Sequence, residues 1–332
     1  MSKIICIGSS AQDIFFPTDG GAVTETPEDL LSQKKISFEL GAKYSIDDRF
    51  ESLGGCAVNA ACGLARLGEN SVCYTLLGND MVGEWIRKEI KKEKVDDSLI
   101  ETAECFSGLS AIVVDEKSGE RIIFSNQEAN ERMKISIDKI SEVNWIFITD
   151  LSGDWKKITD DVLEAACKIR AKVAFNPRGK NISDDPRKVY ELAGKTEIFF
   201  VNKDEAIEIV KSVGGGESDL NNEVELLKSL KESGAKIVVI TDGPRGAWVS
   251  DGENAFFAEG IKVKAKDTTG AGDAFSSGFL AACVKEKGLE EALKWGTSNG
   301  ASVVKFFGGV EGLLRLEEIK EKAKNIEAKK IG

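Results

Sequence analysis

The sequence predicts an α/β fold in which a mostly parallel sheet lies between two layers of helices. Two observations lead to this prediction. Short apolar and β-branched runs alternate with amphipathic stretches of helical length, which is typical of a parallel sheet with helices on both faces. The chain has 332 residues, 42% of them hydrophobic, so it can bury one large core or one core with a small accessory unit.

The predicted elements follow one another along the chain. The strand-like runs are Lys3–Ile7, Ser71–Leu77, Trp145–Thr149, Ala171–Phe175, Glu197–Val201 and Lys236–Thr241. The helical stretches are Val58–Leu67, Val82–Glu93, Trp155–Arg170, Lys203–Val213 and Glu223–Glu232. The Lys- and Glu-rich end from Glu317 is interpreted as a solvated helix. Because ligands of such folds gather at the carboxyl ends of the strands, we expect the functional residues directly after these runs.

Two segments interrupt the alternation and are predicted to form a small β lid. Residues 14–52 are irregular and polar, apart from short strand-like pieces such as Ile36–Leu40. Residues 106–124 indicate a hairpin around the turn Glu116-Lys117-Ser118-Gly119. A small sheet over the active cleft would exclude water. The predicted division is a core of residues 1–13, 53–105 and 125–332 and a lid of residues 14–52 and 106–124.

The charge composition argues against a nucleic-acid or membrane partner. The chain has 45 Lys and Arg residues against 56 Asp and Glu residues, a net charge of −11, and no basic block. Both kinds of partner select for clustered Lys and Arg. No apolar run approaches the roughly 18 residues of a membrane span, and residues 1–8 are too short and too lightly charged for a signal peptide. We expect a cytoplasmic protein.

The absence of histidine limits the chemistry that the chain can perform. Without His there is no Ser-His-Asp or Cys-His nucleophile, no imidazole acid-base group and no His-ligated metal. The seven cysteines are scattered and form no CxxC pair, which favours free thiols over a zinc site. Carboxylates, Lys, Arg, helix termini and oxygen-bound cations remain for catalysis.

The most informative segment is residues 267–275, which read DTTGAGDAF. It joins a strand-like stretch at Gly260–Lys266 to an apolar helix, so it predicts a strand-to-helix turn. Gly270 and Gly272 let the backbone approach a ligand closely, and the free amides of a helix start attract anions. A carboxylate would repel a phosphate there, unless Asp273 takes the proton of the hydroxyl that attacks the phosphate. The alternative is a glycine-rich turn with an N-terminal helix Asp.

Other nucleotide-binding motifs do not match. The sequence contains no GxxxxGK[ST], so the chain is not a P-loop protein. Gly8-Ser9-Ser10-Ala11, after the first predicted strand, lacks the second and third glycines of the dinucleotide fingerprint. Phe275 stands where that fingerprint needs Gly or Ala after Gly270 and Gly272. A dehydrogenase is therefore disfavoured.

Five motifs in order give the chain a resemblance to the ribokinase or PfkB family of carbohydrate and nucleoside kinases. Residues 267–282 resemble the C-terminal signature of the family, and residues 54–68 resemble its N-terminal signature. Three further family landmarks are Asn202-Lys203-Asp204-Glu205, Thr241-Asp242-Gly243-Pro244-Arg245-Gly246 and Asn299. The resemblance covers essentially the whole chain. It implies a ribokinase-like three-layer α/β/α core with a small β lid, and ATP-dependent kinase activity.

The resemblance implies roles for the residues at the reacting groups. Asp273 would be the base that takes the proton of the substrate hydroxyl. The amides of Gly270, Ala271 and Gly272 would stabilise charge on the transferring phosphoryl group.

On the substrate side, the resemblance implies contacts from two other segments. Asp13, just after the first predicted strand, would accept hydrogen bonds from sugar hydroxyls. Gly54 and Gly55 would form the lid hinge and allow close backbone approach to the sugar. Asn59 would hydrogen-bond to the sugar from the following helix.

The resemblance also implies a nucleotide and a metal. Glu205 with Asn202 would organise Mg²⁺ and its water shell near the triphosphate. The residues that would line the phosphates, ribose and adenine are Thr241, Gly243, Gly246 and Asn299. A monovalent cation such as K⁺ would bind beside the loops at Asp267 and Gly308-Gly309.

One departure from the family pattern leaves the substrate open. Several sugar-specific members carry Asp-x-Asn-x-Arg where this chain has Ala174-Phe175-Asn176-Pro177-Arg178, so the first Asp is missing. A role for Arg178 in binding an acidic sugar is therefore in doubt. Lid residues such as Phe124 could stack on a nucleobase, and cations such as Arg121 could bind a sugar phosphate, but packing and solvation are the simpler interpretations. A neutral sugar or the ribose of a nucleoside is favoured.

Three functions are compatible with these observations. The first is an ATP-dependent kinase acting on a primary hydroxyl of a free sugar, and the second is a nucleoside kinase of the same fold. The third is a catalytically silent sugar-binding regulator, which the retention of Asp273 and Glu205 argues against. The resemblance also implies that a second subunit covers the lid, so a homodimer is expected.

Overall fold

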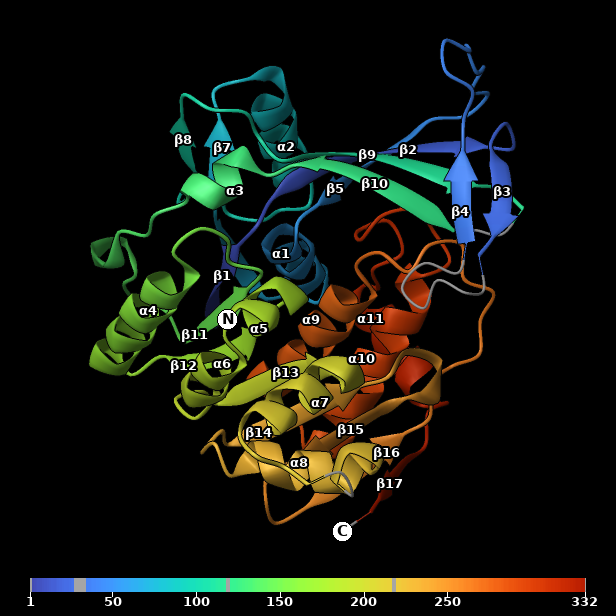
Figure 1. The fold of residues 1–332 in the computed structure, drawn as a ribbon. Helices are drawn as coiled ribbons and strands as arrows, with labels where there is room; N and C mark the ends of the chain where they lie inside the picture. Colours follow the sequence, from blue (N-terminus) through green and yellow to red (C-terminus); the bar gives the residue numbers. More distant parts are fainter. Residues whose placement is uncertain (1, 27–33, 118–119, 217–218, 332) are drawn as a thin grey trace.

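The computed structural model describes residues 2–26, 34–117, 120–216 and 219–331. In Figure 1 a large sheet passes through the molecule with helices on both sides, and smaller strands project from one end of it. The predicted three-layer α/β/α core is therefore confirmed.

The large sheet contains nine strands of described residues: β1 Lys3–Gly8, β6 Asn70–Tyr74, β11 Trp145–Thr149, β12 Lys172–Asn176, β13 Ile198–Asn202, β14 Ile237–Thr241, β15 Ala247–Ser250, β16 Ala255–Ala258 and β17 Ala328–Lys330. Their order is β17-β16-β15-β14-β13-β12-β11-β1-β6. The strands from β6 to β14 pair in parallel, and β15, β16 and β17 add antiparallel strands at one edge. The six sequence-predicted strands all contribute to the parallel part.

Helices cover both faces of this sheet. They are α1 Cys56–Arg66, α2 Met81–Lys92, α3 Glu128–Arg132, α4 Trp155–Ile169, α5 Gly179–Asp184, α6 Pro186–Ala193, α7 Lys203–Ser212, α8 Glu223–Lys231, α9 Ala271–Val284, α10 Leu289–Val303 and α11 Leu316–Ala323. Successive strand residues point to opposite faces. In β1, Ile4 and Cys6 join the hydrophobic cluster with α1, α9 and α10, whereas Ile5 and Ile7 join the cluster with α4, α6 and α7. Among the described helices, none is both long and apolar enough to span a bilayer.

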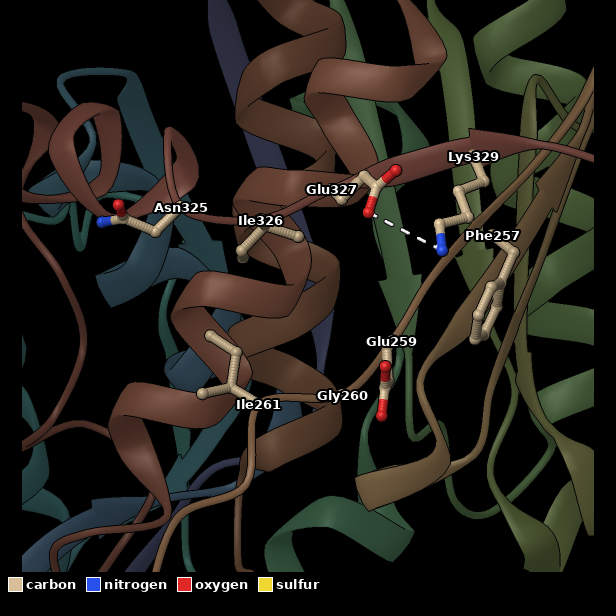
Figure 2. A pocket seen from close by; sticks show the side chains of 8 residues that line it. All are labelled: Phe257, Glu259, Gly260, Ile261, Asn325, Ile326, Glu327 and Lys329. Carbon is tan, nitrogen blue, oxygen red and sulfur yellow. Dashed lines mark ion pairs between the residues drawn. The ribbon is translucent and has the colours of Figure 1, made fainter.

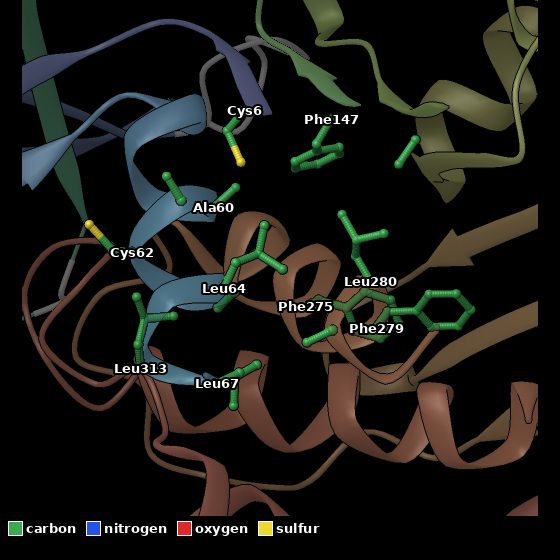
Figure 3. Packing of buried hydrophobic residues seen from close by; sticks show 14 of the residues in the cluster. Cys6, Ala60, Cys62, Leu64, Leu67, Phe147, Phe275, Phe279, Leu280 and Leu313 are labelled. Carbon is green, nitrogen blue, oxygen red and sulfur yellow. The ribbon is translucent and has the colours of Figure 1, made fainter. Parts of the chain in front are cut away.

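Close packing of α9 against α1 and α10 positions the N-terminal end of α9. Figure 3 shows Phe279 of α9 among the buried side chains that fill this layer. Small residues allow the helices to approach: a Cβ on Gly63 of α1 would lie within 3.0 Å of Ser277, and one on Gly278 within 3.0 Å of the backbone of Trp295. The place of the α9 N-terminus is thus determined by helices on both of its sides.

The two interrupting segments pair into a second sheet, called here the accessory sheet. It consists of β2 Ala11–Thr18, β5 Phe50–Gly54, β9 Leu109–Asp115 and β10 Arg121–Asn126, in the order β10-β9-β2-β5. The predicted hairpin and its pairing with the first segment are therefore confirmed. Phe15 of β2 and Val114 of β9 pack with Phe307 of the core. Ser118 and Gly119 of the predicted turn lie outside the described residues, as do residues 27–33 of the first segment.

Two further strand pairs complete the described structure. β3 Ala22–Glu25 pairs with β4 Lys34–Ser37, and β7 Leu76–Gly78 pairs with β8 Glu101–Ala103. The expected single strand at residues 71–77 is wrong, because β6 ends at Tyr74 and the chain then leaves the large sheet to form β7.

Two other local predictions are also wrong. Residues 260–266 are irregular, since β16 ends at Ala258. The charged end of the chain is more than a solvated helix: α11 buries Ile319 and Ala323, and β17 extends the large sheet. These two apolar residues are four positions apart, so they form a single buried stripe on a helix that otherwise looks polar.

Replacing Phe279 by Ala is expected to lower the free energy of unfolding by about 3–5 kcal/mol, as buried Phe-to-Ala changes usually do. The side chain is 0% exposed, and its ring centroid lies 5.5 Å from that of Phe200. Phe306→Ala is the matched control, because Phe306 is 47% exposed; its effect should stay within about 1 kcal/mol. Urea unfolding measures both variants, and equal losses would contradict the packing described.

Candidate active site

The first turn of α9 presents backbone amides at the edge of the core. Gly270 precedes the helix with a φ of 73°, in the left-handed region that favours glycine. A Cβ on Gly270 would lie within 3.0 Å of Gly309, so two backbones approach closely there. Amides of a first helical turn have no partner within the helix, although the amide of Ala271 makes a 3.3 Å hydrogen bond to Thr268. The predicted strand-to-helix turn is thus the N-terminus of α9.

Asp273 lies in this first turn and is 2% exposed. Its Oδ2 accepts a hydrogen bond of 3.0 Å from Nδ2 of Asn59, and its Oδ1 forms an ion pair with Nη2 of Arg178. Burial raises the pKa of Asp273, while Arg178 and Asn59 act in the opposite direction. The carboxylate is therefore buried and oriented from two sides, and it can accept a proton more readily than an exposed Asp.

Asn59 brings α1 into the site. It is 3% exposed, and a Cβ on Gly309 would lie within 3.0 Å of its amide. While Nδ2 is bonded to Asp273, the buried Oδ1 has no hydrogen-bond partner among the described residues. A buried acceptor without a partner is unfavourable. A donor such as a ligand hydroxyl would satisfy it.

Asp13 adds a second buried carboxylate from β2. It pairs across the accessory sheet with Ser52 on one side and Ser110 on the other, and it is 6% exposed. Burial raises its pKa to about 6; a hydrogen bond from Ser110 opposes this shift, and the charges of Asp267 and Asp273 add to it. Asp13 thus lies near enough to Asp273 for the two charges to interact.

Gly54 and Gly55 lie where β5 passes into α1. A Cβ on Gly54 would lie within 3.0 Å of the carboxylate of Asp13, so only glycine leaves room for that side chain. Gly55 is the N-cap of α1 with a φ of 85°, and a Cβ there would meet the backbone of Ser10. Both glycines are needed for close packing at the junction between the accessory sheet and the core.

Arg178 and Cys56 are site residues that the sequence analysis did not assign. Arg178 follows β12 and contacts Cys56 as well as Asp273. Asp150, directly after β11, accepts a 2.5 Å hydrogen bond from Oγ of Ser9. Its charge also acts on the guanidinium of Arg178. The signal in the sequence was the position of Arg178 directly after a buried strand, where ligand-binding residues of such folds gather.

A further contact missed in the sequence links the accessory sheet to the α9 turn. Arg121 of β10 forms an ion pair of 3.4 Å with Asp267 and a 3.2 Å hydrogen bond to Oγ1 of Thr268. Nζ of Lys266 lies 4.8 Å from the ring centroid of Phe50 in β5 and 4.1 Å from that of Phe307 in the core. The accessory sheet is therefore in direct contact with the loop that precedes α9.

Asn202 and Glu205 form a capping box at the start of α7. Asn202 accepts a 2.9 Å hydrogen bond from the amide of Glu205, and Oε2 of Glu205 accepts one of 2.8 Å from the amide of Asn202. Burial raises the pKa of Glu205. Among the described residues, no group of three or more acidic or thiol side chains could hold a metal ion. The carboxylate of Glu205 fits Mg²⁺ held through water, since Mg²⁺ commonly keeps several waters.

The other predicted nucleotide residues fall into two groups. Thr241 ends β14, and Gly243 and Gly246 flank the turn after it with φ values of 48° and 120°. No atom of the described residues would lie within 4 Å of a Cβ on Gly243, so the chain is open at that residue, whereas a Cβ on Gly246 would meet the backbone of Ala258.

Asn299 lies elsewhere, in the interior of α10. It is 0% exposed, donates a 2.8 Å hydrogen bond to the carbonyl of Ala274 and accepts one of 2.9 Å from the amide of Leu314. Both ends of its amide are thus used within the protein. Here Asn299 ties α9 to α10, and its expected place at the adenine edge stays a prediction.

A pocket of about 270 Å³ lies at the edge of the large sheet (Figure 2). It is lined by Phe257, Glu259, Gly260, Ile261, Asn325, Ile326, Glu327 and Lys329. A Cβ on Gly260 would touch the backbone of Pro244, so the pocket adjoins the turn at residues 243–246. None of its lining residues was predicted to bind substrate, and it is separate from the Asp273 site.

A buried carboxylate beside the amides of a helix N-terminus fits a phosphotransferase that acts on an alcohol group, because the carboxylate can accept the hydroxyl proton and the amides can bind the phosphoryl group. The chain matches the pfkB family of carbohydrate kinases over residues 43–314, and it belongs to that family. The resemblance seen in the sequence is therefore confirmed.

Relatives of this chain include several kinases. It is 26% identical to an ATP-dependent 6-phosphofructokinase of Thermoanaerobacterium thermosaccharolyticum, over 86% of this chain and 89% of the relative. It is 29% identical to a ribokinase of Haemophilus influenzae, over 79% of this chain and 82% of the relative. The solved nucleoside kinase of Methanocaldococcus jannaschii has the same fold, with a TM-score of 0.74, 23% identity and 98% of both chains covered.

Replacing Gly270 by Ala is expected to lower the free energy of unfolding by at least about 1–2 kcal/mol, the cost of a left-handed backbone for an L-residue. The clash with Gly309 adds to this cost. Gly288→Ala is the control, because Gly288 has a φ of −61° and no described atom would lie within 4 Å of its Cβ. Chemical denaturation compares the two, and a Gly270 variant as stable as its control would refute the close backbone approach.

Proposed function

We propose that this protein is an ATP-dependent kinase that transfers the γ-phosphoryl group to a hydroxymethyl group of a small sugar, with Asp273 as the base. The observation that best supports this proposal is the buried carboxylate of Asp273 in the first turn of α9, bonded to Asn59 and beside the Gly270–Gly272 amides. A site that only bound phosphate would gain nothing from a carboxylate there, because the two charges repel each other.

In the proposed reaction, the substrate hydroxyl gives its proton to Asp273 as its oxygen forms a bond to the γ-phosphorus. The bond from that phosphorus to the bridging oxygen breaks, and its electron pair leaves with ADP. The amides of Gly270, Ala271 and Gly272 stabilise the charge on the transferring group. Because burial raises its pKa, Asp273 is a stronger base than an exposed Asp.

Neutral hydroxyls suit the substrate side of the site. Asp13 and the unpartnered Oδ1 of Asn59 are hydrogen-bond acceptors, and both are buried. The charges of Asp267 and Asp273 reach Asp13, so an anionic group at this end would be repelled. We favour a neutral sugar. A nucleoside is the alternative, because its ribose presents the same hydroxymethyl group.

A catalytically silent sugar-binding regulator is the third function, and it is disfavoured. Such a protein would have no use for a buried base at the phosphate turn. Asp273 nevertheless retains two partners that orient its carboxylate, Asn59 and Arg178.

The proposed cofactors are ATP and Mg²⁺. The open turn at Gly243 and the end of β14 at Thr241 are proposed to receive the nucleotide phosphates and ribose. Glu205 would hold Mg²⁺ through water, and the ion supplies positive charge to the phosphates when bound. A monovalent cation such as K⁺ is proposed beside Asp267 and Gly308-Gly309, where the Asp267 carboxylate also accepts hydrogen bonds from the amides of Gly308 and Thr269.

The accessory sheet is proposed to act as a lid and as a dimer surface. It contributes Asp13 to the site and contacts the α9 turn through Arg121. Water excluded from the site cannot compete with the sugar for the phosphoryl group. Ile123 and Phe124 on its edge strand β10 are 48% and 64% exposed, so a second copy of the chain would cover them. A cytoplasmic homodimer is the assembly that we propose.

The proposed activity is tested by measuring ADP release with ribose, fructose, fructose 6-phosphate and adenosine. We expect turnover with a neutral sugar, and its loss in excess chelator. Asp273→Asn should lower kcat by about 10²–10⁴, because the proton acceptor is removed while the shape is kept. Asp161→Asn is the control, since the partly exposed Asp161 of α4 pairs with Lys157. Near-normal turnover in Asp273→Asn would exclude Asp273 as the base, and adenosine as the best substrate would favour the nucleoside kinase.

Arg121→Ala tests the lid. Loss of its contacts with Asp267 and Thr268 should raise the ratio of ATP hydrolysis to sugar phosphorylation, because the lid closes less completely. Arg132→Ala is the control, as Arg132 forms an exposed ion pair with Glu128 on α3.

Phe124→Asp tests the dimer, and its sedimentation should show a weakened dimer. An unchanged coupling ratio in Arg121→Ala would contradict the lid, and a monomeric wild-type protein would contradict the dimer.

A further inference from the structure

The guanidinium of Arg178 borders two parts of the proposed site. It reaches from the β12–α5 loop to the first turn of α9, where Nη2 forms an ion pair with Oδ1 of Asp273. Its Nη1 lies 3.8 Å from the place that a Cβ of Gly272 would take. One cation therefore lies beside both the proposed base and the amides proposed to receive the phosphoryl group.

Of the charged groups around Arg178, Asp273 is the one that forms an ion pair with it among the described residues. Asp150 acts on it electrostatically, but a carboxylate oxygen of Asp150 already accepts a hydrogen bond from Ser9. Burial raises the pKa of the Cys56 thiol, so this neighbour stays neutral. The influence of Arg178 also extends to Glu205, the proposed metal-organising residue. Arg178 thus contacts the proposed base and acts electrostatically on the proposed metal-organising residue.

The hydrogen-bonding capacity of Arg178 is incompletely used. Its Nε is buried and has no hydrogen-bond partner among the described residues. The side chain as a whole is 30% exposed, so another ligand can reach it. A guanidinium has five N–H donors in one plane and suits the oxygens of a phosphoryl group. Arg178 therefore has an N–H donor to offer and is accessible to a ligand, beside the place where the transferring phosphoryl group would carry its negative charge.

We propose that Arg178 is a catalytic residue that moves from the carboxylate of Asp273 to the oxygens of the transferring phosphoryl group. This inference rests on the kinase function proposed above. When Asp273 takes the hydroxyl proton, its negative charge is neutralised, while negative charge remains on the transferring group and develops on the departing ADP. The same guanidinium compensates the charge before and during transfer. The bonds that form and break are those of the proposed reaction, and no further reactant is needed.

The alternative is that Arg178 only positions and neutralises Asp273. The two roles differ in one respect: a catalytic Arg178 contacts the γ-phosphoryl group, and a positioning Arg178 does not. A double-mutant cycle separates them, because the Asp273→Asn background removes the charge that Arg178 would otherwise neutralise.

The first experiment measures binding of ATP and ADP by calorimetry to wild-type protein, Arg178→Ala, Asp273→Asn and the double variant. We expect Arg178→Ala to reduce the preference for ATP over ADP, and to do so also in the Asp273→Asn background. No effect of Arg178→Ala in that background would overturn the proposal. Arg187→Ala is the matched control, since Arg187 is exposed on α6 and bonds to the carbonyl of Ser212.

The second experiment measures turnover. Arg178→Ala should lower kcat by about 10²–10³, as loss of a donor to a developing charge does, with a smaller change in the sugar KM. Arg178→Lys should recover part of the rate, and guanidinium added below denaturing concentrations should rescue Arg178→Ala but not the wild type. Circular dichroism checks that each variant is folded. Full activity of folded Arg178→Ala would overturn the proposal.

The pH profile gives a third measurement. The charged groups near Asp273 are Arg178, Asp150 and Asp13, with the neutral Cys56 thiol and the Asn59 amide also against it. Arg178 lowers the pKa of Asp273, so its removal should move the acidic limb of kcat/KM to higher pH. An unmoved limb would contradict the direct ion pair.

If the wild-type protein phosphorylates no member of the substrate panel, the proposed function fails, whereas the ATP and ADP binding cycle still decides whether Arg178 contacts the γ-phosphoryl group.

Discussion

The arrangement of this site depends on the burial of one carboxylate. Asp273 is 2% exposed, and a buried charge is tolerated only where other groups compensate it. Compensation comes from the N-terminal end of α9, from the amide of Asn59 on α1 and from the guanidinium of Arg178 after β12. These three elements are far apart in the chain. Compensation of this single charge therefore links α9, α1 and the end of β12 to one another.

Close backbone approach is the second constraint, and glycine makes it feasible. Gly270 lies against Gly309, and Gly54 leaves room for the carboxylate of Asp13. Any Cβ at these positions would displace the neighbour that forms the site. The turn before α9 contacts the 308–309 loop, and α9 itself packs against α1. The first turn of α9 is therefore held in place from two sides. A rigid first turn keeps its amides preorganised for an anion, which is how such sites lower a reaction barrier.

The charges of the site are distributed unevenly, and this links the core to the accessory sheet. Asp13, Asp267 and Asp273 supply negative charge, while Arg178 meets the core side of that cluster and Arg121 meets it from β10. Asp267 and Asp273 belong to the α9 turn and the loop before it, and each forms an ion pair with one of these two arginines. Ion pairing and the contact of Phe15 with Phe307 thus both hold the accessory sheet against the core.

The sequence alone determined the α/β class, the parallel strands, the accessory hairpin and the turn at residues 267–275, because each depends on local periodicity or local glycine chemistry. It could not place Asn299 in the interior, since a buried and an exposed Asn look alike in a helix of small residues. Nor could it divide residues 71–77 between two sheets, because both pieces are apolar. The pairing of Arg178 with Asp273 spans 95 residues, and that of Arg121 with Asp267 joins the accessory sheet to the loop before α9. Only the tertiary structure decided these contacts, because a long-range ion pair depends on where distant strands end and leaves no local pattern in the chain.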